Sequence, residues 1–334
     1  MSRTSRLFAA LAVAAAVLFT ADLAIGSVAL TPSEVWRALT GGAVDPTISD
    51  IVLKIRLLKA LTALLAGAAL SAAGLQMQTL FRNPLAGPYV LGISAGASLG
   101  VALFVLGAPL LGIATHSFIR ALGMAGAAWV GSALVLALVM AVSRRIKDIM
   151  VLLILGMMLG SGIGSVVEIL QYLSPEAALK SFVVWTMGSL GDVTAGQLAL
   201  LVPVVAAGLA LSVALVKPLN LLLLGEHYAR TSGLDIRRAR ILLLLSTVLL
   251  AGTITAFCGP VGFVGLAVPH LARMIFRSAD HRILMPASML TGAALLLLCD
   301  LVSKLLALPI NTITALTGIP VVIFVVLRNR TLFR

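Results

Sequence analysis

The sequence has few charged and few aromatic residues. Charged residues make up 11% of the chain and aromatic residues 5%, whereas hydrophobic residues make up 60%. Soluble domains contain about a quarter charged residues, so this composition excludes a soluble globular protein. The mean hydropathy of +1.13 indicates a bilayer environment. Backbone groups in a bilayer must be paired within each spanning segment, and the alternation of a membrane β-barrel is absent, so the long apolar runs predict an all-α fold.

Several motifs that would indicate chemistry are also missing. The sequence has no G-x-x-x-x-G-K-[ST] phosphate loop and no H-E-x-x-H metal pair. Cys258 and Cys299 have neither metal nor disulfide spacing and are interpreted as small packing residues. We therefore predict no catalytic residue, no metal site and no cofactor in this chain, and enzyme interpretations are weak.

Apolar windows predict a polytopic membrane protein with about ten transmembrane helices in a single domain, residues 1–334. The predicted spans are Leu7–Val28, Leu57–Leu80, Leu91–Leu106, Phe118–Val142, Met150–Leu170, Gln197–Val216, Ile241–Phe257, Val261–Ile275, Leu284–Leu305 and Ile313–Val326.

The basic residues indicate the orientation. With the N- and C-termini in the cytoplasm, most of the 24 Lys and Arg residues fall on the inner side, as the positive-inside rule requires. The exceptions are Arg37, Lys54, Arg56, Lys59, Arg120, Lys180 and Lys304. The first apolar run is too long for a cleaved signal and is predicted to be a retained helix. The net charge of +12 lies in short loops at the membrane face, which argues against nucleic-acid binding.

A polar island between two apolar runs is the most informative segment. It spans Leu221–Leu245 and reads LLLLGEHYARTSGLDIRRARILLLL. We predict two short helices, Glu226–Ser232 and Asp235–Ile241, with a hinge at Gly233 in the left-handed conformation of a helix end. Its pattern indicates a surface that a cytoplasmic partner contacts.

Two sets of glycines recur at intervals of four and predict smooth helix faces. The sets are Gly92, Gly96 and Gly100, and Gly156, Gly160 and Gly164. Static helix packing and helix movement around a pathway both remain open for them.

Acidic residues are rare in the predicted spans. Asp22, Glu168 and Asp300 are predicted near helix ends and not as a buried cluster at mid-membrane. Ion-driven carriers usually need intramembrane carboxylates or broken-helix ion sites. The spacing of Asp300 and Lys304 predicts mutual neutralisation on one helix. Energy is therefore expected from outside the chain.

Five ordered segments resemble the iron-siderophore, haem and vitamin B12 permeases of bacterial ABC importers. They are RLLKALTALLAGAALSAAGLQMQTLFRNPLAGPYVLGISAGAS from Arg56 to Ser98, the island GEHYARTSGLDIRRAR, and then FCGPVGFVGLAVPHLARMI, DHRILMPASMLTGA and LPINTITALTGIPVVIFVVLR. The resemblance runs in the same order from Arg56 to the C-terminus.

This resemblance implies a vitamin B12 permease-like fold in the bacterial inner membrane. It also implies a homodimer with the translocation path between the copies, two cytoplasmic ATPase subunits that carry ATP and Mg, and a periplasmic binding protein. The motif match assigns the ATPase contact to Gly225, Glu226, Tyr228, Ala229 and Gly233.

The resemblance implies further sites at both faces of the membrane. Arg56, Lys59 and Lys304 match residues that dock the binding protein, although Leu58 and Lys59 depart from the family's R-L-P-R pattern and lysine lacks the bidentate fork of arginine.

On the cytoplasmic face, Arg82, Asn83 and Pro84 begin a predicted turn near the exit, because proline and glycine interrupt the helix there. The cytoplasmic gate is expected around Ile149 and Met150.

A ferric siderophore is the expected cargo of such a permease, with haem and cobalamin as alternatives of the same family. An ion-coupled secondary transporter is the alternative from a different class, and a membrane-embedded scaffold is a more distant one.

Overall fold

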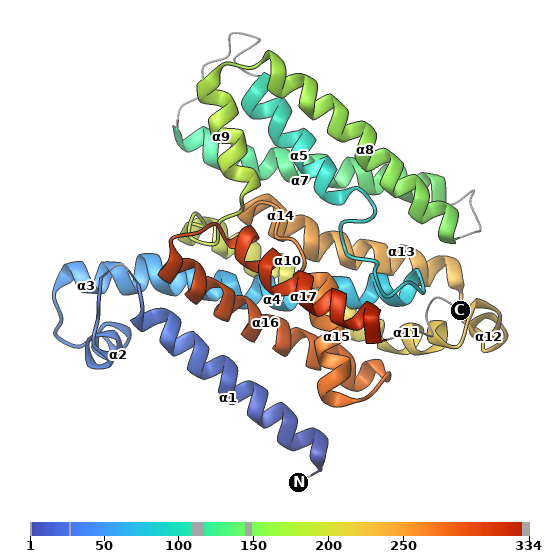
Figure 1. Cartoon of the computed structure of the whole chain (residues 1–334), viewed down its shortest axis with the longest axis horizontal. Helices are drawn as coiled ribbons and strands as arrows, with labels where there is room; N and C mark the ends of the chain where they lie inside the picture. The colour runs from blue at the N-terminus through green and yellow to red at the C-terminus, as the bar shows by residue number, and fades with distance from the viewer. Residues whose placement is uncertain (1, 27, 108–116, 144–148, 329–334) are drawn as a thin grey trace.

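The computed structural model describes residues 2–26, 28–107, 117–143 and 149–328, and every regular element in these ranges is helical (Figure 1). The α-helices are α1 Arg3–Ala24, α2 Pro32–Thr40, α3 Pro46–Asp50, α4 Leu57–Leu80, α5 Ile93–Ala102, α7 Ser117–Ser143, α8 Ile149–Leu173, α9 Glu176–Thr186, α10 Ala195–Ala214, α11 Val216–Leu223, α12 Glu226–Thr231, α13 Ile236–Thr247, α14 Thr253–Cys258, α15 Val264–Phe276, α16 His281–Leu306 and α17 Ile310–Arg328. Three π-helical segments, η1 Ile51–Arg56, η2 Leu103–Gly107 and η3 Val248–Gly252, continue or join these helices.

The predicted all-α membrane architecture is confirmed. Six helices in the described residues are long and apolar enough to cross a membrane, namely Arg3–Ala24, Gly123–Ser143, Met150–Leu173, Ala195–Ala214, Ile236–Cys258 and His281–Leu306. Shorter apolar helices cover Ile93–Gly107, Val264–Phe276 and Ile310–Val325. With α4, these helices coincide with the spans that the sequence predicts.

Helix α4 forms the centre of the molecule, with α15 and α16 packed against it (Figure 1). Nearly all of its side chains from Ala66 to Leu80 are buried, and most of them are Ala, Gly or other small residues. A side chain at Gly67 would lie 2.2 Å from the carbonyl oxygen of Gly292, and one at Gly74 would lie 1.6 Å from that of Gly265. Small residues thus allow three backbones to touch, which is how helices associate in a bilayer.

A second group of helices, α5, α7, α8 and α9, lies along one side of this centre (Figure 1). Phe182 of α9 and Val101 of α5 belong to its own buried apolar cluster. Gly96 and Gly100 bring α5 against α7, because side chains there would lie 2.6 Å and 2.0 Å from the carbonyl oxygens of Gly131 and Ala127. Helix α8 covers this group and leaves much of its own apolar surface exposed.

The two ends of the molecule differ. Helices α2 and α3 lie at one end, which we call the outer end, and α11 and α12 lie at the opposite end, which we call the island end (Figure 1). The rings of Phe8 in α1 and Phe276 in α15 are 4.7 Å apart, so α1 begins near the last turn of α15 and runs toward α2. Sequence reasoning missed α2, although Thr31 and Glu34 form a capping box that marks its start.

Candidate coupling and docking sites

Helix α12 is the centre of the predicted ATPase contact. It begins after Gly225, whose φ of 105° is open to glycine and unfavourable for other residues. Ala229 is fully buried and anchors the helix, whereas Tyr228 is 51% exposed and faces outward. The short helix therefore presents one aromatic side chain on a fixed base.

Gly233 ends α12 as the sequence predicts. Its φ is 82°, in the left-handed region. The N–H of Leu234 donates to the carbonyl of Ala229 at 3.0 Å, and the N–H of Gly233 donates to that of Arg230 at 3.0 Å. These two bonds are the Schellman motif, which satisfies the last carbonyls of a helix and fixes the direction in which the chain leaves it.

The second half of the island differs from its prediction. Asp235–Ile241 is not a separate short helix, because α13 begins at Ile236 and runs past Ile241 to Thr247, and η3 and α14 extend the same span to Cys258. Asp235 caps its start, with its carboxylate accepting the N–H of Arg238 at 3.0 Å. No proline or glycine lies between Ile236 and Thr247, so the polar residues are the first turns of the spanning helix itself.

One ion pair connects the two parts of the island. Arg240 Nη2 donates to Glu226 Oε1 at 3.2 Å, and the arginine side chain is only 8% exposed. Because Arg240 belongs to the long helix and Glu226 to the first turn of α12, this ion pair links α12 to a spanning helix.

The predicted turn after α4 is present beside the island. Phe81 closes α4, Arg82 takes a φ of 50°, and Asn83 accepts the N–H of Leu85 at 2.9 Å. His270 Nε2 lies 2.8 Å from the carbonyl oxygen of Pro84, so this ring nitrogen is the donor. The turn is thus held to α15.

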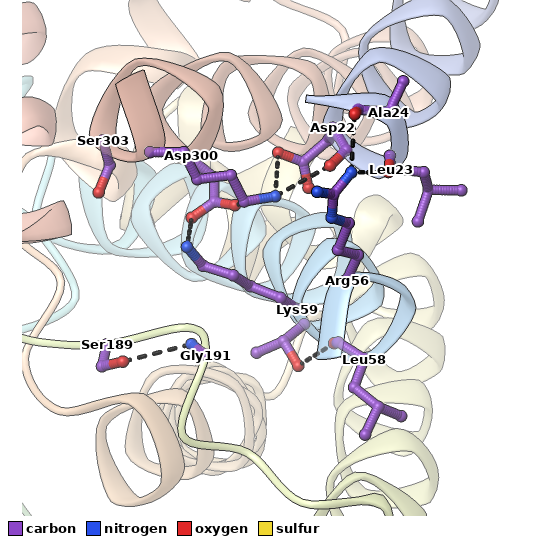
Figure 2. A network of polar contacts seen from close by, with 12 residues as sticks. Asp22, Leu23, Ala24, Arg56, Leu58, Lys59, Ser189, Gly191, Asp300 and Ser303 are labelled. Atoms are coloured by element: carbon purple, nitrogen blue, oxygen red, sulfur yellow. Dashed lines mark hydrogen bonds and ion pairs between the residues drawn. The ribbon is translucent and has the colours of Figure 1, made fainter. Parts of the chain in front are cut away.

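The predicted docking cations contact other residues of this chain, and Figure 2 shows Arg56 pointing toward Leu23 and Ala24 and Lys59 pointing toward Asp300. Lys304 Nζ is 2.8 Å from Asp22 Oδ1 and 3.1 Å from Asp300 Oδ2, and Lys59 Nζ is 3.0 Å from Asp300 Oδ1. The Asp22 and Asp300 side chains are 0% and 1% exposed. The neutralisation of Asp300 by Lys304 is therefore present, and Lys304 also bridges α16 to α1.

Arg56 completes this outer network. Its guanidinium donates to the carbonyl oxygens of Leu23 at 2.9 Å and Ala24 at 2.7 Å, and also to that of Val28. Asp22 and Asp300 lie near the ends of α1 and α16, as predicted. The sequence did not show that these two helices bring them together in one buried network. Docking by Arg56, Lys59 and Lys304 stays a prediction, while the observed contacts give them an internal role.

The second glycine set is only partly used for packing. A side chain at Gly156 would lie 2.9 Å from the backbone of Leu91, and one at Gly160 would lie 3.8 Å from Gly92, which takes a φ of 76° before α5. Gly164 has no atom within 4 Å. Close backbone approach at these glycines is therefore limited to Gly156 and Gly160, whereas Val167 of α8 packs with Val101 of α5 through side chains.

The expected gate residues lie where α8 begins. The helix starts at Ile149, whose side chain lies outside the described residues, and Met150 is 48% exposed. Their role as a gate stays a prediction.

A buried polar cluster between α4, α10 and α13 was not anticipated. Gln76 Nε2 donates to Ser212 Oγ at 2.6 Å and to Ser246 Oγ at 3.0 Å, and its Oε1 accepts from Thr247 Oγ1 at 3.2 Å. All four residues are fully buried. The available signal was the pair of glutamines, Gln76 and Gln78, in a mostly apolar helix, and the sequence did not reveal their partners.

Known proteins are similar to this chain over most of its length. Residues 13–328 match the model of the FecCD transport family. The chain is 36% identical to the hemin transport system permease protein HmuU of Yersinia pestis, over 92% of this chain and 90% of that protein. It is 34% identical to the vitamin B12 import system permease protein BtuC of Vibrio cholerae, over 98% and 94% of the two chains.

A solved structure agrees with these sequence relatives. An inward-facing metal-chelate type ABC transporter matches with a TM-score of 0.84 and 30% identity, over 97% of this chain and 99% of the other. The chain therefore belongs to the FecCD transport family. It is a multi-pass permease of an ABC importer in the bacterial inner membrane, as the ordered motifs predicted.

Proposed function

We propose that two copies of this chain form the permease of an importer for a ferric siderophore or a related metal chelate. The proposal gives the permease two ATPase subunits at the island end, which hold ATP and Mg, and a binding protein at the outer end. The single observation that supports it most is α12, a short helix braced against the spanning helix α13 by Glu226 and Arg240.

The exposed polar side chains of α8 support a translocation path between two copies of the chain. Ser161, Ser165 and Glu168 are exposed along one side of a helix whose other exposed side chains are mostly apolar. Polar groups are costly against hydrocarbon and are tolerated where they line water or protein. In a homodimer with α8 at the interface, this stripe would line the path.

The cargo proposal rests on relatives. HmuU is named for hemin, BtuC for vitamin B12, and the solved structure for a metal chelate. A permease that is 33% identical, MolB of Haemophilus influenzae, is named for molybdate import. A chelated metal is the chemistry that most of these names share, and within it a ferric siderophore is our first choice, followed by haem and cobalamin.

The test is uptake by the reconstituted transporter. The permease, its co-encoded ATPase and its co-encoded binding protein are placed in proteoliposomes, and uptake of labelled ferric siderophore, haem, cobalamin and molybdate is measured with and without ATP. We expect uptake of one cargo that requires all three components and ATP. Uptake driven by an ion gradient without ATPase would instead establish the secondary transporter.

A further inference from the structure

A pocket of about 230 Å³ opens at the island end, separate from α12. Its walls come from the end of α4, the turn that follows, the end of α11 and the last turns of α15. The lining residues are Gln78, Thr79, Arg82, Pro84, Leu223 and Arg273. Neither aspartate nor glutamate is among them, whereas two are arginines.

The two arginines lack a carboxylate partner in the part of the chain that the structure describes. Arg273 is partly buried, and its Nη1 donates to the neutral Gln78 Oε1 at 2.7 Å. The ion pairs of the described residues include neither Arg273 nor Arg82. Burying the charge of Arg273 is costly unless an anion compensates it, and Arg82 adds a second cation at the exposed side of the pocket. An anion from outside these residues would therefore complete the site.

The walls of the pocket are fixed in place. Gln78 Nε2 donates to the carbonyl of Leu266 at 3.0 Å, which orients its Oε1 toward Arg273. The turn that carries Arg82 is held by the bond between His270 and Pro84 at 2.8 Å. A preorganised guanidinium favours a carboxylate, because its planar fork matches the two oxygens.

The pocket adjoins the proposed coupling surface. Leu223 lines it and ends α11 just before Gly225, and Arg82 Nη1 lies 4.0 Å from the position that a side chain at Gly225 would occupy. A protein that reaches α12 therefore also reaches the pocket mouth. A phospholipid fits less well, because Leu223 and Pro84 are the only apolar side chains among the described residues that line the pocket.

We propose that this pocket receives an aspartate or glutamate side chain of the ATPase subunit, held between Arg82 and Arg273. The inference rests on the proposed function, since it names a contact with the same partner. It adds a second attachment point beside α12, on α4 and α15, so that the ATPase contacts the central helices as well as the island.

The first experiment measures the affinity of the ATPase for the purified permease in nanodiscs at low salt. Arg273→Gln and Arg82→Gln are each expected to weaken binding about tenfold or more, because each leaves the incoming carboxylate without one partner. Arg277→Gln is the matched control, an exposed arginine one turn beyond Arg273 that does not line the pocket, and it is expected to change binding less than twofold. Arg273→Lys should fall between the two, since it keeps the charge and loses the fork.

The second experiment identifies the carboxylate. Carbodiimide treatment joins a lysine amine to a nearby carboxylate as an amide, so Arg82→Lys should give a crosslink to one acidic peptide of the ATPase, and Arg277→Lys should not give it. Arg82 is exposed on a turn, so this variant is expected to fold even if changes at Arg273 impair folding.

The outcomes separate the two proposals. If folded Arg82→Gln and Arg273→Gln variants bind the ATPase as tightly as the wild type, the inference is overturned and the proposed function stands. If the wild type does not bind the ATPase, the proposed function fails first. An anionic phospholipid retained by the wild type and lost from Arg273→Gln, with ATPase affinity unchanged, would assign the pocket to lipid and overturn the inference.

Discussion

Glu226 Oε1 lies 3.2 Å from Arg240 Nη2, which ties the first turn of α12 to the first turns of the spanning helix α13. The two residues are far enough apart in sequence to belong to different helices, and Gly233 turns the chain between them. Together with the buried side chain of Ala229, this contact holds α12 against the membrane helix. In the proposed transporter, we expect this connection to carry movement of the ATPase to α13.

We expect Glu226→Gln to uncouple ATP hydrolysis from transport. The substitution keeps the shape of the side chain and removes its charge, which weakens the connection to α13 by about 1 kcal/mol for a partly exposed pair. Cargo moved per ATP hydrolysed in proteoliposomes should fall several-fold, while the amount of folded permease stays the same. Glu176→Gln, an exposed glutamate in α9, is the control, and an unchanged ratio for Glu226→Gln would contradict the coupling role.

Gly233 should tolerate asparagine and reject valine. No atom lies within 4 Å of the position that its side chain would take, so the φ of +82° and not space limits substitution. This conformation costs a β-branched residue about 1–2 kcal/mol or more of folding free energy, whereas asparagine adopts it readily. Gly233→Val is expected to reduce coupled transport and Gly233→Asn to retain most of it. Equal transport by the two variants would mean that the left-handed helix end is not needed.

Gly74→Ala should destabilise the fold strongly. The added methyl group would lie 1.6 Å from the carbonyl oxygen of Gly265, and backbone on both sides prevents it from moving away. Overpacking of this kind costs about 3 kcal/mol or more when the backbone has to shift. The thermal midpoint in detergent measures the effect. Gly126→Ala, with no atom within 4 Å, is the control and should match or slightly exceed the wild-type midpoint.

Asp300→Asn should also destabilise the protein, by about 3–5 kcal/mol, since it leaves Lys59 and Lys304 with one carboxylate between them in a buried site. Asp50→Asn is the matched control, because its pair with Lys54 at 2.8 Å is exposed and worth less than about 1 kcal/mol. The thermal midpoints of unfolding of the Asp300→Asn and Asp50→Asn variants are compared with that of the wild type. A similar small effect from both substitutions would show that water reaches the Asp300 cluster.

The predicted role of Arg56 and Lys59 in docking the binding protein can be tested by charge reversal. Charge reversal at Arg56 or Lys59 should weaken the affinity of the binding protein, measured at low salt on the monodisperse, folded fraction of each variant. Lys54→Glu is the comparison, because Lys54 is exposed at the same end of the molecule. Wild-type docking and uptake by folded Arg56→Glu and Lys59→Glu would remove both residues from the docking surface and leave them only their internal contacts.

Much of the fold was predictable because the bilayer imposes it. Long apolar runs become helices in hydrocarbon, and each predicted span has a helix in the structure. Local rules also predicted Gly233 correctly, since the end of a short helix favours glycine in the left-handed region. The helix at Asp235–Ile241 was assigned wrongly because polarity suggested a boundary where the backbone has none.

Pairings between distant residues were not predictable. Asp22 and Lys304 are nearly the whole chain apart, and Gln76 meets Ser212 and Ser246 from two other helices. Such contacts depend on which helix faces turn toward each other, and a nearly uniform apolar composition leaves those faces unmarked.

The sequence by itself determined that this chain is a helical membrane protein and, through five ordered motifs, which transporter family it belongs to. Tertiary structure alone decided that Lys59 and Lys304 face inward, that α12 is braced by Arg240, and that Arg82 and Arg273 share a pocket. The physical reason is the sequence separation of the residues involved. Hydropathy and helix ends depend on neighbouring residues, whereas charge pairing and cavities arise only when separate helices pack together.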